Sequence, residues 1–272
     1  MVTIRVIPCL LLQYGSLVMT TRFRAPRYVG EPVDAVRAFN ATGAGELLLL
    51  DITASHARGL FRQKADIRPD FDLIARLSDE SFVPVACGGG VRTIEDIRDL
   101  LSRGVDKVLI NTRAVEDPSF VGRAAGVFGG RHVAVSIDAR RLPDGRYEVC
   151  TGGGARPSGI DPVGHAKRME ALGAGEIYLN AIDRDGTRQG YDLALVQAVA
   201  RSVGIPVTAC GGAGSVDDFG AAIRAGAAAA VASSVFVFHC GQRAALIDYP
   251  AWAEIVGAPG GAAGPAVAQD GG

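Results

Sequence analysis

The stretch GAGELLLLDI, residues 43–52, is a glycine turn that leads into a continuous apolar run, and it returns as GAGEIYLNAI at residues 173–182. Three further blocks repeat in the same order: RVIPCLL (5–11) with HVAVSID (132–138), CGGGV (87–91) with CGGAG (210–214), and GVDKVLINT (104–112) with GAAAAVASS (226–234). The paired blocks begin 130, 127, 123 and 122 residues apart. This regular spacing predicts a chain built from two similar halves, each holding four strand–helix units.

Eight short apolar runs set the predicted architecture. Because the runs are continuous rather than alternating, we expect a parallel sheet covered on both faces. Eight strand–helix units favour a (β/α)8 TIM barrel, and an open doubly wound sheet is the weaker alternative. Thr93 with Asp96, and Ser215 with Asp218, are spaced like helix capping boxes. The predicted strands are 3–11, 46–52, 84–88, 107–111, 132–138, 176–182, 206–210 and 229–234, and the predicted helices are 32–43, 71–81, 93–104, 161–173, 193–204 and 215–226.

Size and composition narrow the class of protein. With 272 residues, 48% of them hydrophobic, the chain can bury one sizeable core. We expect residues 1–256 to form the barrel and the Gly/Ala/Pro-rich residues 257–272 to be a disordered tail. A formal net charge of −1 disfavours a nucleic-acid partner, and the apolar run 6–12 is too short to span a membrane. The five cysteines form no C-x-x-C pair, which indicates reduced thiols in a cytoplasmic protein, and the four histidines lack metal-ligand spacing. We therefore expect no metal, and no motif indicates a cofactor.

Two glycine-rich strand ends predict phosphate binding. In a (β/α)8 barrel the carboxyl ends of the strands surround the active site. Gly88–Gly90 and Gly211–Gly212 fall at such ends, where glycine lets backbone N–H groups approach a phosphate. One unit later each half has a polar strand end, Asn111-Thr112 and Ser233-Ser234. Two equivalent cradles suit a substrate with a phosphate at each end, whereas the alternative is two structural turns inherited from the duplication.

Carboxylates at strand ends are the candidate acid/base groups. Asp138 ends an apolar strand, which favours a general acid/base with a raised pKa, although backbone donors or an arginine could also hold it. Its counterpart in the first half is Leu11. Asp183 and Asp185 lie in the polar loop IDRDGT, which either closes a turn or contacts substrate, and Asp51 is expected to brace the barrel.

Four charged residues gather at the opposite end of the barrel. They lie at or near the amino ends of strands, away from the predicted chemistry. Alternating charges there form either a plain ring of ion pairs or a gate on the barrel axis. The four residues are Arg5, Glu46, Lys107 and Glu176.

At CGGG, LDITAS, DKVLINT, SIDARR, GAGEIYLNAIDRDGT and CGGAGS the chain resembles the cyclase subunit of imidazole glycerol phosphate synthase, the HisF-type family, over roughly residues 1–255. The resemblance implies a heterodimer with a HisH-type glutaminase on the amino-terminal barrel face. It implies that ammonia made there passes a charged gate of Arg5, Glu46, Lys107 and Glu176, and that Asp106 lies at the interface. It also implies catalysis by Asp138 and a phosphorylated substrate bound by Gly90, Asn111, Thr112, Asp185, Gly186, Gly212, Ser233 and Ser234.

Two positions depart from the family pattern. The strand-1 aspartate of the family falls at Leu11, and the lysine of its flexible loop after strand 1 falls at Met19. Leucine cannot move a proton, and losing a general acid/base group typically costs ~10²–10⁴ in rate. With VIPCLLL and RAPRYVGEP, this combination resembles a sub-branch found with surface-polysaccharide genes, whose barrel supplies ammonia to amidate a sugar. A genuine histidine-pathway cyclase and a non-catalytic ammonia conduit that activates a glutaminase are the alternatives.

Overall fold

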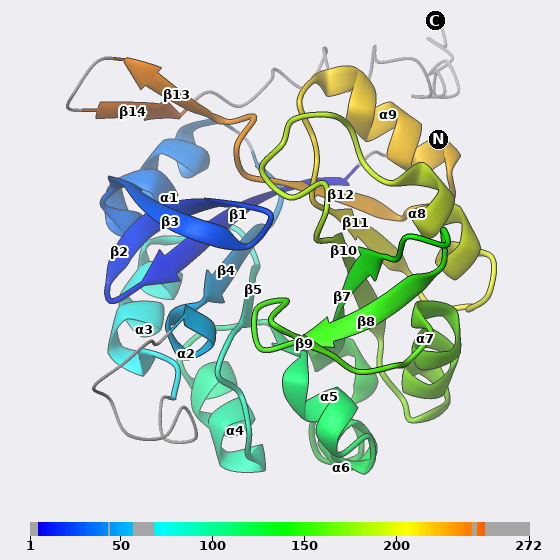
Figure 1. The fold of residues 1–272 in the computed structure, drawn as a ribbon. Helices are drawn as coiled ribbons and strands as arrows, with labels where there is room; N and C mark the ends of the chain where they lie inside the picture. Colours follow the sequence, from blue (N-terminus) through cyan, green and yellow to red (C-terminus); the bar gives the residue numbers. More distant parts are fainter. Residues whose placement is uncertain (1–4, 43, 57–67, 241–243, 248–272) are drawn as a thin grey trace, which may run out of the picture.

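The computed structural model describes residues 5–42, 44–56, 68–240 and 244–247, with the side chains of 237–240 and 244–247 excepted. Eight parallel strands in this part of the chain close into a barrel, surrounded by helices (Figure 1). The predicted (β/α)8 fold is confirmed, and the open-sheet alternative is wrong because β10 also pairs with β7. The predicted tail lies outside the described residues, so the domain boundary stays a prediction.

All eight predicted barrel strands are present, in chain order around the barrel. Each half contributes four of them, so the sequence repeat is also a repeat of structure. The barrel strands of the first half are β1 (Arg5–Gln13), β4 (Leu47–Asp51), β5 (Val85–Gly88) and β6 (Lys107–Ile110), and those of the second are β7 (Val133–Arg141), β10 (Glu176–Ala181), β11 (Val207–Cys210) and β12 (Ala229–Ala232).

The helices pack around the outside of the barrel and match the six predicted segments. Both predicted capping boxes form, with Asp96 and Asp218 accepting from the backbone N–H of Thr93 and Ser215. The sequence did not predict the helices between β6 and β7. The helices are α1 (Pro32–Thr42), α2 (Thr53–His56), α3 (Phe71–Glu80), α4 (Ile94–Ser102), α5 (Thr112–Glu116), α6 (Ser119–Phe128), α7 (Pro162–Ala171), α8 (Leu193–Ala200) and α9 (Val216–Arg224).

Each half also carries an antiparallel extension that the sequence analysis missed. After β1 the chain turns back as β2 (Ser16–Thr21) and β3 (Arg24–Gly30), where a flexible loop was expected. After β7 it turns back as β8 (Tyr147–Thr151) and β9 (Arg156–Pro157). Both extensions stand at the carboxyl ends of the barrel strands, so they wall the region where the site was predicted. A last hairpin, β13 (Val237–Cys240) with β14 (Ala244–Ile247), lies against α1 and β3.

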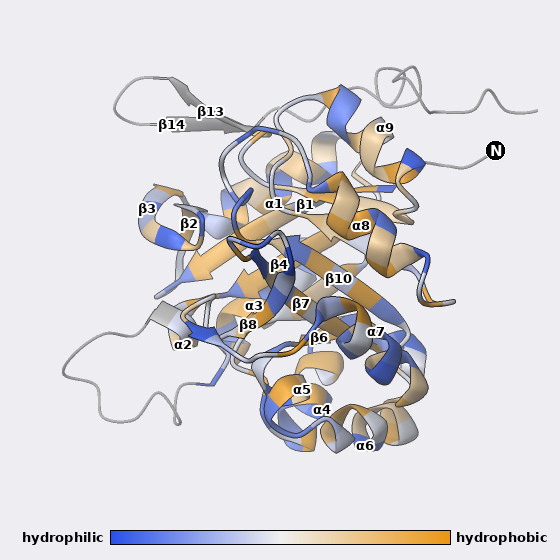
Figure 2. Ribbon diagram, turned by 45° about the vertical axis from the view of Figure 1, so that its right-hand side comes forward, coloured by the Kyte–Doolittle hydropathy of each residue, from blue (hydrophilic) through white to orange (hydrophobic). Residues whose placement is uncertain are grey.

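Two separate sets of side chains fill the core. The larger set packs the outward faces of the strands against the helices, and β1 is largely hydrophobic in colour (Figure 2). The smaller set, which includes Ile7, Leu48 and Tyr178, fills the interior of the barrel. No helix among the described residues is long and apolar enough to cross a membrane.

Candidate active site

A cavity of about 660 Å³ opens at the carboxyl ends of the barrel strands. Its wall is built from both halves, because strand ends, glycine turns and the β2–β3 hairpin all contribute to it. The predicted site residues that line it are Leu11, Gly90, Asn111, Thr112, Asp138, Asp185, Gly186, Gly212, Ser233 and Ser234.

Asp138 is a buried carboxyl group within this cavity. Only 7% of the residue is exposed, and one carboxylate oxygen accepts a hydrogen bond of 2.8 Å from the Asn111 amide. Burial raises the pKa of Asp138 to about 7, with a small contribution from Asp185 and against the opposing effect of the Asn111 bond. A carboxyl group with this pKa exchanges protons near neutral pH, which is what a general acid/base requires. The predicted raised pKa of Asp138 is therefore found.

Leu11 occupies the matching place in the first half. It lines the same cavity, and it is the first residue of β1 that pairs with the hairpin strand β2, opposite Val18. Asp138 is likewise the first residue of β7 that pairs with β8, opposite Cys150. The two positions are equivalent in structure as well as in sequence. One therefore presents a carboxyl group to the cavity and the other a hydrocarbon.

The glycine turns have a structural requirement of their own. Gly89 has φ +105°, and a Cβ there would lie 1.9 Å from the Asp51 carbonyl oxygen. Gly212 has φ +118°, and its Cβ would lie 2.3 Å from the Gly190 carbonyl oxygen. The close backbone approach is therefore enough to explain these two glycines. This is what the alternative of two structural turns, without phosphate binding, requires. Phosphate binding by the cavity-lining Gly90, Gly186 and Gly212 stays a prediction.

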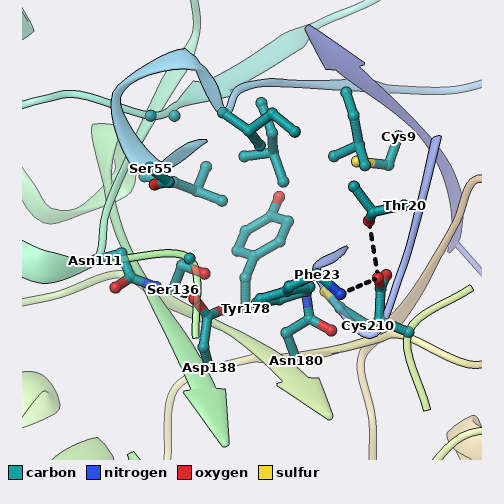
Figure 3. A pocket seen from close by; sticks show the side chains of 18 of the residues that line it. Cys9, Thr20, Phe23, Ser55, Asn111, Ser136, Asp138, Tyr178, Asn180 and Cys210 are labelled. Atoms are coloured by element: carbon teal, nitrogen blue, oxygen red, sulfur yellow. Dashed lines mark hydrogen bonds between the residues drawn. The ribbon is translucent and has the colours of Figure 1, made fainter. Parts of the chain in front are cut away.

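Asp185 connects the cavity to the hairpin of the first half. Its carboxylate accepts hydrogen bonds from the Thr20 hydroxyl at 2.9 Å and the Phe23 N–H at 3.2 Å (Figure 3). Its carbonyl oxygen accepts a bond of 2.8 Å from the Arg22 N–H. Burial raises the pKa of Asp185, and these two carboxylate bonds oppose the rise. Asp185 therefore both lines the cavity and holds the hairpin, and its contact with substrate stays a prediction.

The other predicted carboxylates accept hydrogen bonds from backbone N–H groups. Asp51 accepts bonds from the N–H groups of Thr53 at 2.9 Å and Asp70 at 3.1 Å, which fits the expected bracing role. Asp183 is exposed and accepts a bond of 2.7 Å from the Arg141 N–H. Asp51 also lines the cavity, but both of its carboxylate oxygens accept backbone bonds, whereas Asp138 accepts a bond from a side chain.

The charged residues at the opposite end of the barrel form a connected set, here called the charge ring. Arg5 is 2.7 Å from Glu46 and 3.5 Å from Glu176, and Lys107 is 3.5 Å from Glu46 and also contacts Glu176. Thr208 donates a further bond of 2.6 Å to Glu176, whose side chain is 5% exposed. The predicted ring of ion pairs is confirmed, whereas its use as a gate stays a prediction.

Asp106 lies at the same end of the barrel as the charge ring, next to Lys107 in the chain. It is exposed, and its carboxylate accepts a bond of 2.8 Å from the Val85 N–H. Its carbonyl oxygen is 2.6 Å from Nδ1 of His132. These contacts fix the turn before β6, and the role of Asp106 at a partner interface is not tested by them.

Two residues of the site were missed from the sequence, Tyr178 and Asn180 on β10. Both line the cavity, and the Oδ1 atom of Asn180 is buried without a partner among the described residues. The available signal was the alternation along EIYLNAI, which turns Glu176, Tyr178 and Asn180 to one face of the strand. Figure 3 shows the Tyr178 ring standing in the middle of the pocket.

Burial holds two thiols and one histidine of the described residues in their neutral forms. Burial raises the pKa of the Cys9 and Cys210 thiols, as expected for small buried hydrophobic residues. His165 is buried in the packing of α7, and burial lowers its pKa to about 4. The described residues hold no group of three or more side chains that could bind a metal ion.

Comparison with known proteins places the whole barrel in one family. Residues 5–242 match the model described as "Histidine biosynthesis protein". The chain is 45% identical over 251 residues to the "Putative imidazole glycerol phosphate synthase subunit hisF2" of Pseudomonas aeruginosa, covering 92% of this chain and 97% of that one. It is 43% identical to imidazole glycerol phosphate synthase subunit HisF of Alkaliphilus metalliredigens (88% and 92% covered) and 45% identical to that of Streptomyces griseus (86% and 90% covered). This chain therefore belongs to the family of HisF-type subunits of imidazole glycerol phosphate synthase.

Proposed function

We propose that this chain is the barrel subunit of a glutamine-dependent synthase, and that it delivers ammonia to a phosphorylated acceptor other than the one its family cyclises. The acceptor is a sugar of a surface polysaccharide, which is amidated. The observation that carries the proposal is Leu11, because it stands in the cavity at the position equivalent to Asp138. A reaction that divides proton transfer between two carboxylates cannot run with one of them replaced by a hydrocarbon.

The rest of the site supports retained binding and ammonia delivery. Asp138 has a pKa of about 7, so one acid/base group is poised to take a proton from an attacking ammonia molecule or to donate one to a leaving group. The cavity is large enough for a sugar phosphate and keeps the glycine turns and the polar ends Asn111-Thr112 and Ser233-Ser234. The charge ring at the far end of the barrel is intact.

A glutaminase partner fits the amino-terminal end of the barrel. Phe82, in the turn between α3 and β5, is 86% exposed, and Val127 near the end of α6 is 57% exposed. Both side chains precede barrel strands, as Asp106 does, and exposed large apolar side chains at that end suit a surface that is covered in a complex. The proposed partner is a HisH-type glutaminase, whose ammonia would enter at the charge ring.

Histidine-pathway cyclisation is the competing function, and the high identity to curated HisF subunits favours it. Complementation separates the two. A bacterium that lacks its HisF subunit would express this chain together with a HisH subunit on medium without histidine. We expect no growth from well-folded protein, and growth at the rate given by authentic HisF would overturn the proposal.

A second variant shows how far the site has diverged. Leu11→Asp restores the family carboxylate but leaves Met19 and the hairpin unchanged, so we expect it to remain unable to support growth. In the native host, Asp138→Asn would then be scored on the amide content of the surface sugar. A normal sugar in that strain would remove Asp138 from the mechanism and leave a barrel that only conducts ammonia.

A further inference from the structure

Tyr178 is the largest side chain in the interior of the barrel, and nothing in the proposed chemistry uses it. It is 1% exposed and belongs to the inner set of side chains, together with Ala86, Ala134 and Ala229. Its counterpart in the first half, 130 residues earlier, is Leu48. These three alanines, one each on β5, β7 and β12, are small, which leaves room for one phenol ring beside them.

The phenol is attached to the charge ring. Its hydroxyl donates a hydrogen bond of 3.1 Å to Glu46 Oε1, and Lys107 Nζ lies 5.7 Å from the centre of its ring. Glu46 is held in turn by Arg5 at 2.7 Å. Burial raises the pKa of Tyr178 well above its usual range, so the hydroxyl keeps its proton and remains a donor. Tyr178 therefore contacts two of the four members of the ring.

The other side of Tyr178 faces the cavity. The residue lines the cavity with Leu48, Cys9 and Cys210, and its ring stands in the middle of the pocket (Figure 3). A single aromatic side chain thus reaches from the charge ring at one end of the barrel interior to the cavity at the other. A small molecule that entered through the charge ring would meet the Tyr178 ring before it reached Asp138.

We propose that Tyr178 is a second closure of the barrel interior, and that this closure opens with the charge ring because Glu46 holds its hydroxyl. The identification of the passing molecule as ammonia rests on the proposed function, whereas the closure itself does not. When the Arg5–Glu46 pair separates, Glu46 moves and releases the hydroxyl, and the ring is then free to turn aside. The cavity floor and the charge ring would therefore open together. While both are closed, water and ions are kept out of the path.

The coupling can be measured on the full chain without a partner or substrate. Tyrosine is replaced throughout by 3-fluorotyrosine, whose two ring orientations give separate ¹⁹F signals that exchange when the ring flips. The chain has six tyrosines, and Tyr178→Phe and Tyr191→Phe assign the two needed signals. Arg5→Met removes the nearer of the two cationic partners of Glu46 and leaves the Tyr178–Glu46 hydrogen-bonding groups unchanged. We expect the Tyr178 ring to flip about tenfold faster in Arg5→Met, as for a weakened hydrogen bond.

Two controls make this result specific. Tyr191 is a buried tyrosine whose hydroxyl donates to the Val231 carbonyl oxygen, and its flipping should not change in Arg5→Met. Arg37→Met breaks a surface pair with Glu80 and should change neither tyrosine. Equal Tyr178 flipping in wild type and Arg5→Met would overturn the coupling, whatever the outcome of the complementation experiment.

Passage is tested with xenon as the probe in pressurised crystals. In the wild type we expect xenon in the cavity above the Tyr178 ring and none between the ring and Glu46. Tyr178→Leu places at this position the residue of its first-half counterpart, Leu48. In this variant xenon should occupy both the cavity and the space next to Glu46. Xenon on both sides of Tyr178 in the wild type would show that the ring closes nothing. Growth in the complementation experiment together with the expected ring behaviour would discard the proposed acceptor and leave the closure standing.

Discussion

The two halves of the barrel present opposite walls to one cavity. On β1 and β4 three of the side chains that face it are Leu11, Leu48 and Leu50. Their counterparts on β7 and β10 are Asp138, Tyr178 and Asn180, which also face it. The scaffold, the hairpins and the glycine turns are shared, so the duplication kept the geometry. The Asp51 carboxylate on β4 accepts two backbone N–H bonds, whereas the Asp138 carboxylate on β7 accepts a bond from the Asn111 side chain. We therefore expect proton transfer to depend on the second half.

Asp138→Asn should have the largest effect, because it removes the cavity carboxyl group whose pKa of about 7 suits proton transfer. We expect amidating activity to fall by ~10²–10⁴. Asp183→Asn, at an exposed position that does not line the cavity, is the control and should leave activity within about twofold of wild type.

The same variant has a pH-dependent effect on stability. The folded pKa of Asp138, about 7, exceeds its unfolded value, so the folded state loses stability as pH rises from about 4 to about 7. Asp138→Asn should remove this loss and raise the free energy of unfolding at pH 8 by about 2–4 kcal/mol. Urea titrations at pH 4 and pH 8 measure the difference, and an unchanged difference would mean that Asp138 is not a strained buried acid.

The charge ring also differs between the two halves, at the other end of the barrel. Glu46 and Glu176 are counterparts, but Lys107 corresponds to Ala229, so the positive members do not follow the repeat. Lys107→Met should cost about 3 kcal/mol of stability, because it leaves the buried Glu176 without its lysine partner. Lys167→Met on the surface of α7 is the matched control. Equal urea midpoints for the two variants would argue against a structural ring.

His165 is a further difference between the halves, and it should be visible in the stability of the protein at acid pH. Its counterpart on α1 is Ala35, and both are buried. Because the pKa of His165 is lowered to about 4, the unfolded chain takes up a proton below about pH 6.5 that the folded chain refuses. Stability should fall by up to about 3 kcal/mol between pH 6.5 and pH 4. His165→Ala should flatten this part of the curve, and an unchanged slope would assign it to other groups.

The smallest expected effect concerns the hairpins, which cross between the halves. The β2–β3 hairpin is bonded to Asp185 of the second half, and the Gly152 N–H after β8 donates a bond of 3.2 Å to the Thr112 hydroxyl of the first. Thr20→Val should weaken the first crossing by about 1 kcal/mol. Hydrogen exchange should quicken in β2 and β3 but not in β8. Uniform quickening would indicate global destabilisation instead.

The repeat explains how much of this could be predicted from the sequence. Strands such as ELLLLDI are continuous apolar runs with glycine turns before them, and the spacing of the halves fixed their order and the placing of Asp138 against Leu11. The charge ring was also visible, since its members begin or precede strands.

The hairpins and the barrel interior could not be predicted in the same way. The segment RFRAPRYVG is rich in arginine and interrupted by proline, so nothing in its hydrophobic pattern predicts β3. Tyr178 looks like any aromatic residue of a buried strand. Its contact with Glu46 depends on the small alanines of three other strands, which only the closed barrel brings together.

The most direct test of the central account is an assay of the purified full chain with the substrate of imidazole glycerol phosphate synthase and ammonium salts at high pH, where no glutaminase is needed. Authentic HisF under the same conditions is the positive control. With Leu11 in place of the second carboxylate, we predict formation of imidazole glycerol phosphate at least ~10²-fold slower than the control. A rate close to that of HisF would contradict the account and return this chain to the histidine pathway.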